Sequence, residues 1–400
     1  MSTANLKHLF TPGTGAVPPY LAGRKQEQEY FRDCVEVLKG RNSVSRDLIL
    51  YGPRGNGKTA LLRYLQTTTR QEEGDRLDIL WVTPNNIATE TEFTHLLSGP
   101  KKLKDRFKKL TGSVGAWAAS AGIEMDLTGS PSITEHQIRE KCKRKPFILI
   151  IDEAHRLKPS MVESLLNSSQ TVRSDGCPFL LVLAGTPNLG ATLSEANASF
   201  WERSEIIPLG RLSPDEAGQA ISIPLQEAGI TFAPGVLENI VEQTDCYPFF
   251  TQVWGDCLAR RLDETNETEI TLAQVKEVEA AVINERNVMY QVRFNELDRM
   301  SLLPVTESVA EVFLQSSSPI LHENTLEEAI ERGLAGDEPV TNERIMEKVE
   351  QLSHLGYVWQ VSGAYYEPGI PSLMSYITDQ MQENAVSSIR SSRSIAESKQ

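Results

Sequence analysis

A glycine-rich motif of eight residues constrains this chain more than any other feature of its sequence. It follows the pattern G-x-x-x-x-G-K-[ST], and its residues are Gly52, Pro53, Arg54, Gly55, Asn56, Gly57, Lys58 and Thr59. The apolar run DLILY precedes the motif, and the helix-forming stretch TALLRYLQ begins at its last residue, Thr59. A strand therefore leads into the loop, and a helix follows it. Glycine lets successive backbone N–H groups turn toward one anion, and the positive end of the helix faces the same anion. The motif therefore predicts a phosphate-binding loop, in which Lys58 reaches the β- and γ-phosphates of ATP and Thr59 binds Mg²⁺.

A second polar site follows a different apolar run. Phe147–Ile151 leads directly into Asp152 and Glu153. Ligands of an open α/β sheet bind beyond the carboxyl ends of its strands, where these two acids are expected to lie. We expect Asp152 to hold Mg²⁺ and Glu153 to polarise the attacking water as general base. The alternative is that both acids cap the helix that begins near Pro159. His155 is expected to be a packed residue rather than a catalytic one.

Four short apolar runs alternate with helix-forming stretches between residues 21 and 208. They are Asp47–Tyr51, Leu77–Thr83, Phe147–Ile151 and Phe179–Ala184. Continuous apolar runs of this length are typical of strands that are buried on both faces in a parallel sheet. Their alternation with helices predicts an α/β sandwich over residues 21–208, preceded by an N-terminal arm over residues 1–20.

The predicted strands stop after Pro208. Ser213–Glu216 and Thr271–Gln274 are capping signatures that mark the starts of helices. We therefore expect an all-helical domain over residues 209–290.

The last predicted domain spans residues 291–382. It begins helical, with a cap at Thr325–Glu328 and a helix from Thr341 to Leu355. The periodicity then changes, because Tyr357–Val361 and Ala364–Tyr366 flank a Ser-Gly turn and predict a hairpin. Helices followed by one hairpin indicate a winged-helix-like domain, and the Ser-rich residues 383–400 indicate a disordered tail.

Length and composition exclude several classes of protein. Four hundred residues exceed one ordinary hydrophobic core, so we expect two or three domains. The sequence has no apolar run long enough to span a bilayer and no secretory signal, so we expect no membrane contact. Its five cysteines are scattered without a C-x-x-C pair, which predicts reduced thiols in the cytoplasm.

Charge is distributed unevenly along the chain. The net charge of −14 argues against a protein that binds DNA over its whole surface. Residues 301–380 hold 13 acidic and 3 basic residues, which predicts a protein partner for the C-terminal domain rather than DNA. Contact with DNA is possible at two basic patches of the core, although each also fits a solvated helix face. The patches are Lys101, Lys102, Lys104, Arg106, Lys108 and Lys109, and Lys141, Lys143, Arg144 and Lys145.

Taken together, residues 18–280 resemble the AAA+ superfamily, in the branch of origin-recognition-like, archaeal-type and STAND ATPases. Pro19–Arg24 resembles the segment that covers the adenine in this branch, and Ala184–Asn188 resembles the first sensor. The resemblance implies that Thr186 senses the γ-phosphate. Trp201–Leu209 is similar to the stretch that carries an arginine finger, which implies that Arg203 reaches the ATP of a neighbouring subunit in a homo-oligomer.

The helical domain also resembles the lid of this family. Asp245–Phe250 lies where relatives often show "GYP" or "GHP" at the start of the third lid helix, and Pro248 is the nucleotide-binding residue that this resemblance implies. Cys246 departs from the usual glycine. No arginine occupies the second-sensor position, since Arg260 and Arg261 lie further along the helix.

Three functions remain open, all of them for an ATPase. The protein is an oligomeric switch in DNA transactions such as replication or transposition, or a STAND-type signalling or defence ATPase whose C-terminal domain binds a protein. A chaperone-like remodeller is the least favoured, because Gly115–Trp117 is the nearest approach to an aromatic-glycine pore loop in residues 85–146.

Overall fold

The computed structural model describes residues 6–7, 9–86, 92–93, 96–97, 133–334, 336, 339–370 and 372–384. The chain divides into two compact units. The sheet unit comprises residues 24–51 and 58–208, and the helical unit comprises residues 1–23, 52–57 and 209–400. Each unit is described by itself.

The sheet unit contains a five-stranded parallel sheet in the order β2-β3-β4-β1-β5. Its strands are β1 Leu48–Tyr51, β2 Asp78–Val82, β3 Phe147–Ile151, β4 Phe179–Gly185 and β5 Glu205–Pro208. Every residue of β3 and β4 is buried, as expected for central strands of a parallel sheet. The four predicted strands and the parallel sandwich are confirmed. We did not predict β5, a short strand whose first residue is acidic.

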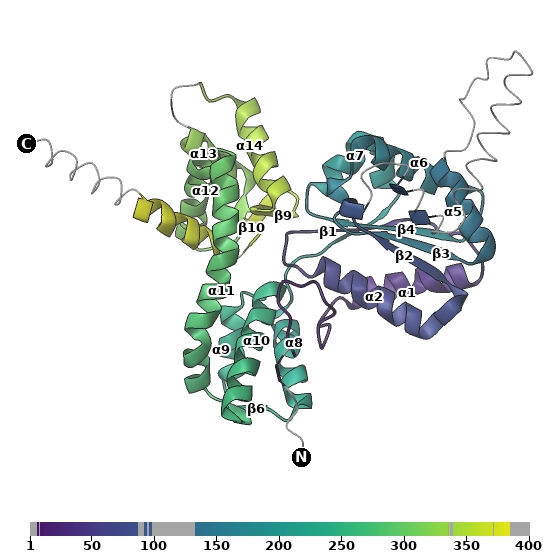
Figure 1. Cartoon of the computed structure of the whole chain (residues 1–400). Coiled ribbons are helices and arrows are strands. Elements are labelled where there is room, and N and C mark those ends of the chain that lie inside the picture. The colour runs from purple at the N-terminus through teal and green to yellow at the C-terminus, as the bar shows by residue number, and fades with distance from the viewer. Residues whose placement is uncertain are drawn as a thin grey trace, which may run out of the picture. The chain divides into compact units, whose positions relative to one another are not determined.

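Helices cover both faces of this sheet (Figure 1). On one face lie α1 Lys25–Lys39 and α2 Lys58–Glu73, and on the other lie α5 Ile133–Arg144, α6 Pro159–Ser174 and α7 Leu189–Glu202. The short 3-10 helices are η1 Gly74–Arg76, η2 Pro84–Asn86 and η3 Ala154–Arg156. The buried side chains between the sheet and α5–α7 form one apolar cluster that includes the ring pair Phe147–Phe179, with centroids 5.6 Å apart.

A buried carboxylate ties three elements of the sheet unit together. Asp47 lies just before β1 and is fully buried. It accepts hydrogen bonds from the Ser169 hydroxyl on α6 at 2.7 Å and from the Leu181 N–H on β4 at 3.1 Å, and Arg173 Nη2 lies 3.2 Å away. Burial raises the pKa of Asp47, while Arg173 and these hydrogen bonds act in the opposite direction.

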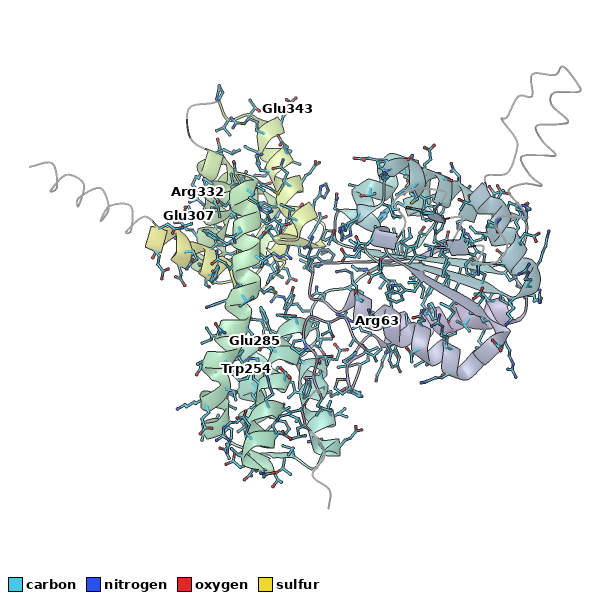
Figure 2. The ribbon with its side chains drawn as sticks, viewed as in Figure 1. Arg63, Trp254, Glu285, Glu307, Arg332 and Glu343 are labelled. Carbon is cyan, nitrogen blue, oxygen red and sulfur yellow. The ribbon has the colours of Figure 1, made fainter. Side chains whose placement is uncertain are left out.

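The helical unit begins with α8 Pro214–Glu227, α9 Val236–Gln243, α10 Pro248–Thr265 and α11 Leu272–Arg299. Both predicted capping boxes are present, at Ser213 and at Thr271. The expectation that strands stop after Pro208 was wrong in one detail, because β6 Thr231–Phe232 and β7 Glu269–Ile270 pair in parallel. Trp254 of α10 lies in the apolar interior of these helices (Figure 2).

The rest of the helical unit consists of α12 Leu303–Gln315, α13 Glu323–Leu334, α14 Asn342–Leu355 and a small sheet. The predicted hairpin is present as β9 Val358–Ser362 and β10 Tyr365–Pro368, and β8 Leu321–His322 pairs with β10. Thr341 caps α14 as expected, but Thr325 caps nothing, because α13 already begins at Glu323. The winged-helix assignment and the domain boundaries stay predictions. Within the residues described, no helix is long and apolar enough to cross a membrane.

Candidate functional site

The loop Gly52–Gly57 needs glycine at three positions. Gly55 and Gly57 have φ of +84° and +81°, a left-handed conformation that side chains with a Cβ rarely adopt. A Cβ at Gly52 would collide with the carbonyl oxygen of Leu209. The same oxygen accepts a hydrogen bond from Asn56 Nδ2 at 3.0 Å. Sequence and backbone therefore agree that this loop is shaped by glycine.

The predicted Mg²⁺ ligands lie side by side in the sheet unit. Thr59, in the first turn of α2, donates from Oγ1 to Asp152 Oδ2 at 2.8 Å. Asp152 directly follows β3 and is buried, which raises its pKa, while the Thr59 bond and the positive charge of Lys58 lower it. A hydroxyl and a carboxylate are hard oxygen donors of the kind that Mg²⁺ binds together with nucleotide phosphates, so these residues fit that ion.

The general-base candidate has a strained backbone. Glu153 has φ of +58°, which is uncommon for a residue with a side chain, and its N–H donates to Asp152 Oδ1 at 2.9 Å. Its side chain is 41% exposed, so solvent water can reach the carboxylate. Strained conformations of this kind concentrate at functional sites.

His155 connects the general-base candidate to the first-sensor candidate. Its side chain is buried, as expected for a packed residue. The Thr186 N–H donates to His155 Nδ1 at 3.3 Å, and His155 Nε2 lies 3.8 Å from Glu153 Oε2. With Nδ1 accepting, a neutral imidazole carries its proton on Nε2, facing the carboxylate. Sequence reasoning missed this link, although the string D-E-A-H contains both residues.

Arg203 lies near the amino ends of the strands, whereas Asp152 lies at their carboxyl ends. It ends α7 and comes two residues before β5, whose first residue Glu205 pairs with Leu48, the first residue of β1. Asp152 instead follows the last residue of β3. Strands of four residues span about 13 Å, so the sheet unit holds Arg203 and Asp152 at opposite ends of its strands.

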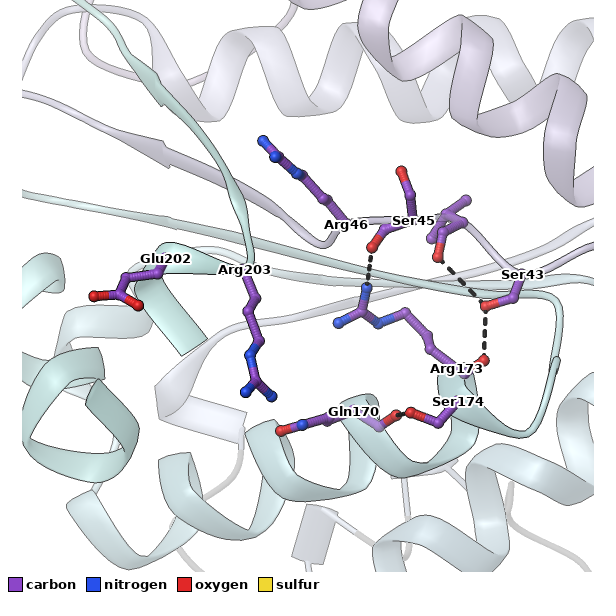
Figure 3. Close-up of a pocket in the computed structure, with 9 residues that line it drawn as sticks. Ser43, Ser45, Arg46, Gln170, Arg173, Ser174, Glu202 and Arg203 are labelled. Atoms are coloured by element: carbon purple, nitrogen blue, oxygen red, sulfur yellow. Dashed lines mark hydrogen bonds between the residues drawn. The ribbon is translucent and has the colours of Figure 1, made fainter. Parts of the chain in front are cut away.

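Arg203 is one of nine residues that line a pocket of about 480 Å³ (Figure 3). Arg173 donates to the Ser45 carbonyl at 3.0 Å, and Arg46 pairs with Glu205 at 3.1 Å. Arg203 points toward Gln170 of α6. Its guanidinium makes no ion pair or hydrogen bond with any residue that the structure describes.

The lid residues lie in the helical unit. Pro248 is the first residue of α10, the third helix after β5, as the family resemblance implies. Asp245 and Cys246 have φ of +50° and +54°, so the departure from glycine leaves a cysteine in the left-handed region. Tyr247 donates a hydrogen bond from its hydroxyl to the carbonyl of Arg54. Sequence reasoning missed this contact.

Of the two basic patches, only the second lies among the residues that the structure describes. Lys101–Lys109 and Gly115–Trp117 lie outside the described residues. In the second patch, Lys141 pairs with Asp78 at 2.7 Å, and ion pairs with neighbouring acids also hold Lys143 and Lys145. Most of its positive charge is therefore compensated.

Comparisons with known proteins agree with the parallel sheet and its covering helices. Residues 43–193 match the sequence-family model described as AAA domain. The fold is similar to that of the Aeropyrum pernix ORC2 protein in ADPNP-ADP complexes, with a TM-score of 0.57 and 15% identity over 95% of this chain and 100% of that chain. It is also similar to the Walker-type ATPase PABY2304 of Pyrococcus abyssi, with a TM-score of 0.59 and 13% identity over 89% of this chain and 96% of that chain. No curated protein matches the chain in sequence. Residues 43–193 therefore resemble an AAA domain, and the fold of the chain is similar to that of the ORC2 protein.

Proposed function

We propose that this protein hydrolyses ATP and acts as a nucleotide-dependent switch. The observation that carries the proposal is the hydrogen bond of 2.8 Å between Thr59 and Asp152, which brings both metal-ligand candidates together at the carboxyl ends of the strands. The glycine-shaped loop Gly52–Gly57 precedes Lys58 directly in the chain, so backbone N–H groups and an ammonium are available to the same phosphates. Mg²⁺ held by Thr59 and Asp152 would neutralise the charge that develops on the phosphoryl group.

In this proposal, Glu153 accepts a proton from the attacking water. Its carboxylate is accessible, and His155 Nε2 and Arg156 Nη1 lie 3.8 Å and 3.9 Å from its Oε2. Because the other imidazole nitrogen accepts the Thr186 N–H, a displacement at Thr186 would be felt at Glu153. This coupling supports the role of Thr186 as a sensor of the γ-phosphate.

We further propose that Arg203 serves a neighbouring subunit in a homo-oligomer. Its position at the amino ends of the strands supports action in trans, because Asp152 of the same chain lies beyond their carboxyl ends. The absence of an ion pair to Arg203 within the described residues leaves the guanidinium available to a phosphate. We also propose Pro248 as a nucleotide contact, because the family resemblance implies one at this position.

The proposed cellular role is in DNA transactions or defence, with the C-terminal helices binding a protein partner. Arg344 of α14 donates to the Pro339 carbonyl at 2.8 Å, and Lys348 bonds Glu347 and Gln351. Both of these basic side chains are thus engaged within the chain, and α14 also carries acids such as Glu343 (Figure 2), which supports protein rather than DNA recognition there. DNA contact is proposed only for the AAA+ core over residues 21–208. A STAND-type signalling ATPase without DNA binding is the alternative.

The remaining proposals concern organisation and location. We propose a lid over residues 209–290, a winged-helix-like domain over residues 291–382 and a cytoplasmic location. The five cysteines, all of them free, support a reducing compartment.

A nucleotide titration tests the central proposal. Lys58→Ala removes the ammonium expected at the β- and γ-phosphates, so ATP affinity should fall at least about tenfold, or about 1.4 kcal/mol. Lys276→Ala, the same change at an exposed lysine of α11, is the control and should bind ATP like the wild type. Equal affinities in the two variants would overturn the assignment of the loop.

A further inference from the structure

Tyr247 contacts the phosphate loop directly within the helical unit. Its side chain is fully buried, and its hydroxyl donates to the carbonyl oxygen of Arg54. A Cβ at Gly55 would lie 2.5 Å from the same hydroxyl oxygen, so the ring and the loop can approach only because residue 55 is glycine. Burial raises the pKa of Tyr247, which keeps the hydroxyl protonated and able to donate.

This hydrogen bond orients a backbone donor of the loop. In a trans peptide the carbonyl oxygen and the N–H of the next residue point to opposite sides. The bond to Tyr247 holds the Arg54 carbonyl on the side of the tyrosine, which turns the Gly55 N–H to the opposite side. Gly55 itself is exposed to solvent. Loops of this type bind phosphate through N–H groups that point to one side, which is the orientation that Tyr247 imposes on Gly55.

A strained turn holds Tyr247 in place. Asp245 and Cys246 are both left-handed, with φ of +50° and +54°, and such a turn persists only where its surroundings enforce it. The Leu212 N–H donates to the Cys246 carbonyl at 2.9 Å, and the Ser372 hydroxyl donates to Asp245 Oδ2 at 2.8 Å. The turn therefore depends on the chain that enters the lid and on residues near the C-terminus.

A row of aromatic rings continues from Tyr247 into the C-terminal core. Ring centroids are 4.9 Å apart for Tyr247 and Phe250, 5.9 Å for Phe250 and Tyr290, and 5.3 Å for Tyr290 and Tyr376. The first three rings are buried in the cluster that also holds the cores of α12, α13 and α14. A displacement of Tyr247 therefore cannot leave the packing of these helices unchanged.

We propose that Tyr247 positions the phosphate loop and transmits its nucleotide state to the C-terminal helices. The inference rests on the proposed binding of ATP at the loop.

Two variants test the inference. Tyr247→Phe removes the hydroxyl and keeps the ring, so the core should stay folded while ATP affinity falls about tenfold, or about 1.4 kcal/mol. Tyr357→Phe is the matched control, because Tyr357 is equally buried and its hydroxyl donates to the Arg293 carbonyl at 2.6 Å rather than to a carbonyl of the loop. Phe250→Leu breaks the aromatic row one step further on and should leave ATP affinity unchanged.

Amide hydrogen exchange supplies the second readout. In the wild type, ATP should change exchange in α11 and α12, and this response should be lost in both Tyr247→Phe and Phe250→Leu. Unchanged ATP affinity in Tyr247→Phe, or a retained exchange response in either variant, overturns the inference. A wild type that binds no ATP, or a Lys58→Ala variant that binds it normally, instead refutes the proposed function.

Discussion

Replacing Arg203 by alanine should abolish hydrolysis without affecting ATP binding. The reason is geometric. Arg203 precedes β5 and Asp152 follows β3, so the two residues lie at opposite ends of strands that are about 13 Å long. An arginine at the amino ends of the strands can act on a nucleotide only if that nucleotide is bound by a second copy of the chain. ATP should therefore promote self-association, because the γ-phosphate becomes part of the interface.

Mixing two inactive variants gives this prediction a magnitude. Arg203→Ala keeps Glu153, and Glu153→Gln keeps Arg203, so an interface formed between the two variants in one orientation contains both wild-type groups. In a head-to-tail assembly from equal amounts, about one interface in four has this composition, and about a quarter of wild-type activity should return. Either variant alone should be at least about a hundredfold less active.

The assay is ATP turnover by each variant and by the mixture, together with light scattering at several protein concentrations with and without ATP. Glu202→Ala, the neighbouring exposed residue of α7, is the control and should be active alone. A monomer under all conditions, with turnover per chain independent of concentration, would refute the trans role of Arg203. Failure of the mixture to exceed the sum of its parts would do the same.

Three further results follow from the structure. Glu153→Gln should still bind ATP while turnover falls about a hundredfold, and turnover at the wild-type level would show that another group orients the water. Asp47→Asn leaves Arg173 without its buried counter-ion and should lower the free energy of unfolding in urea by about 3 kcal/mol. Asp75→Asn, at an exposed pair, is the control and should leave the free energy of unfolding unchanged. Burial raises thiol pKa values to about 11 for Cys34, about 12 for Cys142 and about 11 for Cys257. At pH 8 these three thiols should therefore resist a thiol reagent until the protein unfolds. Rapid labelling of all five cysteines in the native protein would contradict their burial.

The sequence predicted those parts of the protein that depend on neighbouring residues. The loop Gly52–Gly57 could be identified because its glycine spacing is dictated by its own backbone. The strands that lead into Gly52 and Asp152 are short continuous apolar runs, and Ser213 and Thr271 cap helices through bonds to residues two or three positions away. The strand β5 was missed because its pattern is short and partly polar, and the cap at Thr325 was wrong because α13 begins two residues earlier.

Only the tertiary structure decided how residues far apart in the chain meet. Tyr247 bonds to Arg54 across 193 positions, and Ser169 bonds to Asp47 across 122. The position of Arg203 depends on the strand order, in which β5 pairs with β1 rather than with β4, which precedes it in the chain. The physical reason is the same for all three. A local pattern reports the backbone conformation and burial of its own segment, whereas the partner of a segment depends on how the elements pack against one another around a common core.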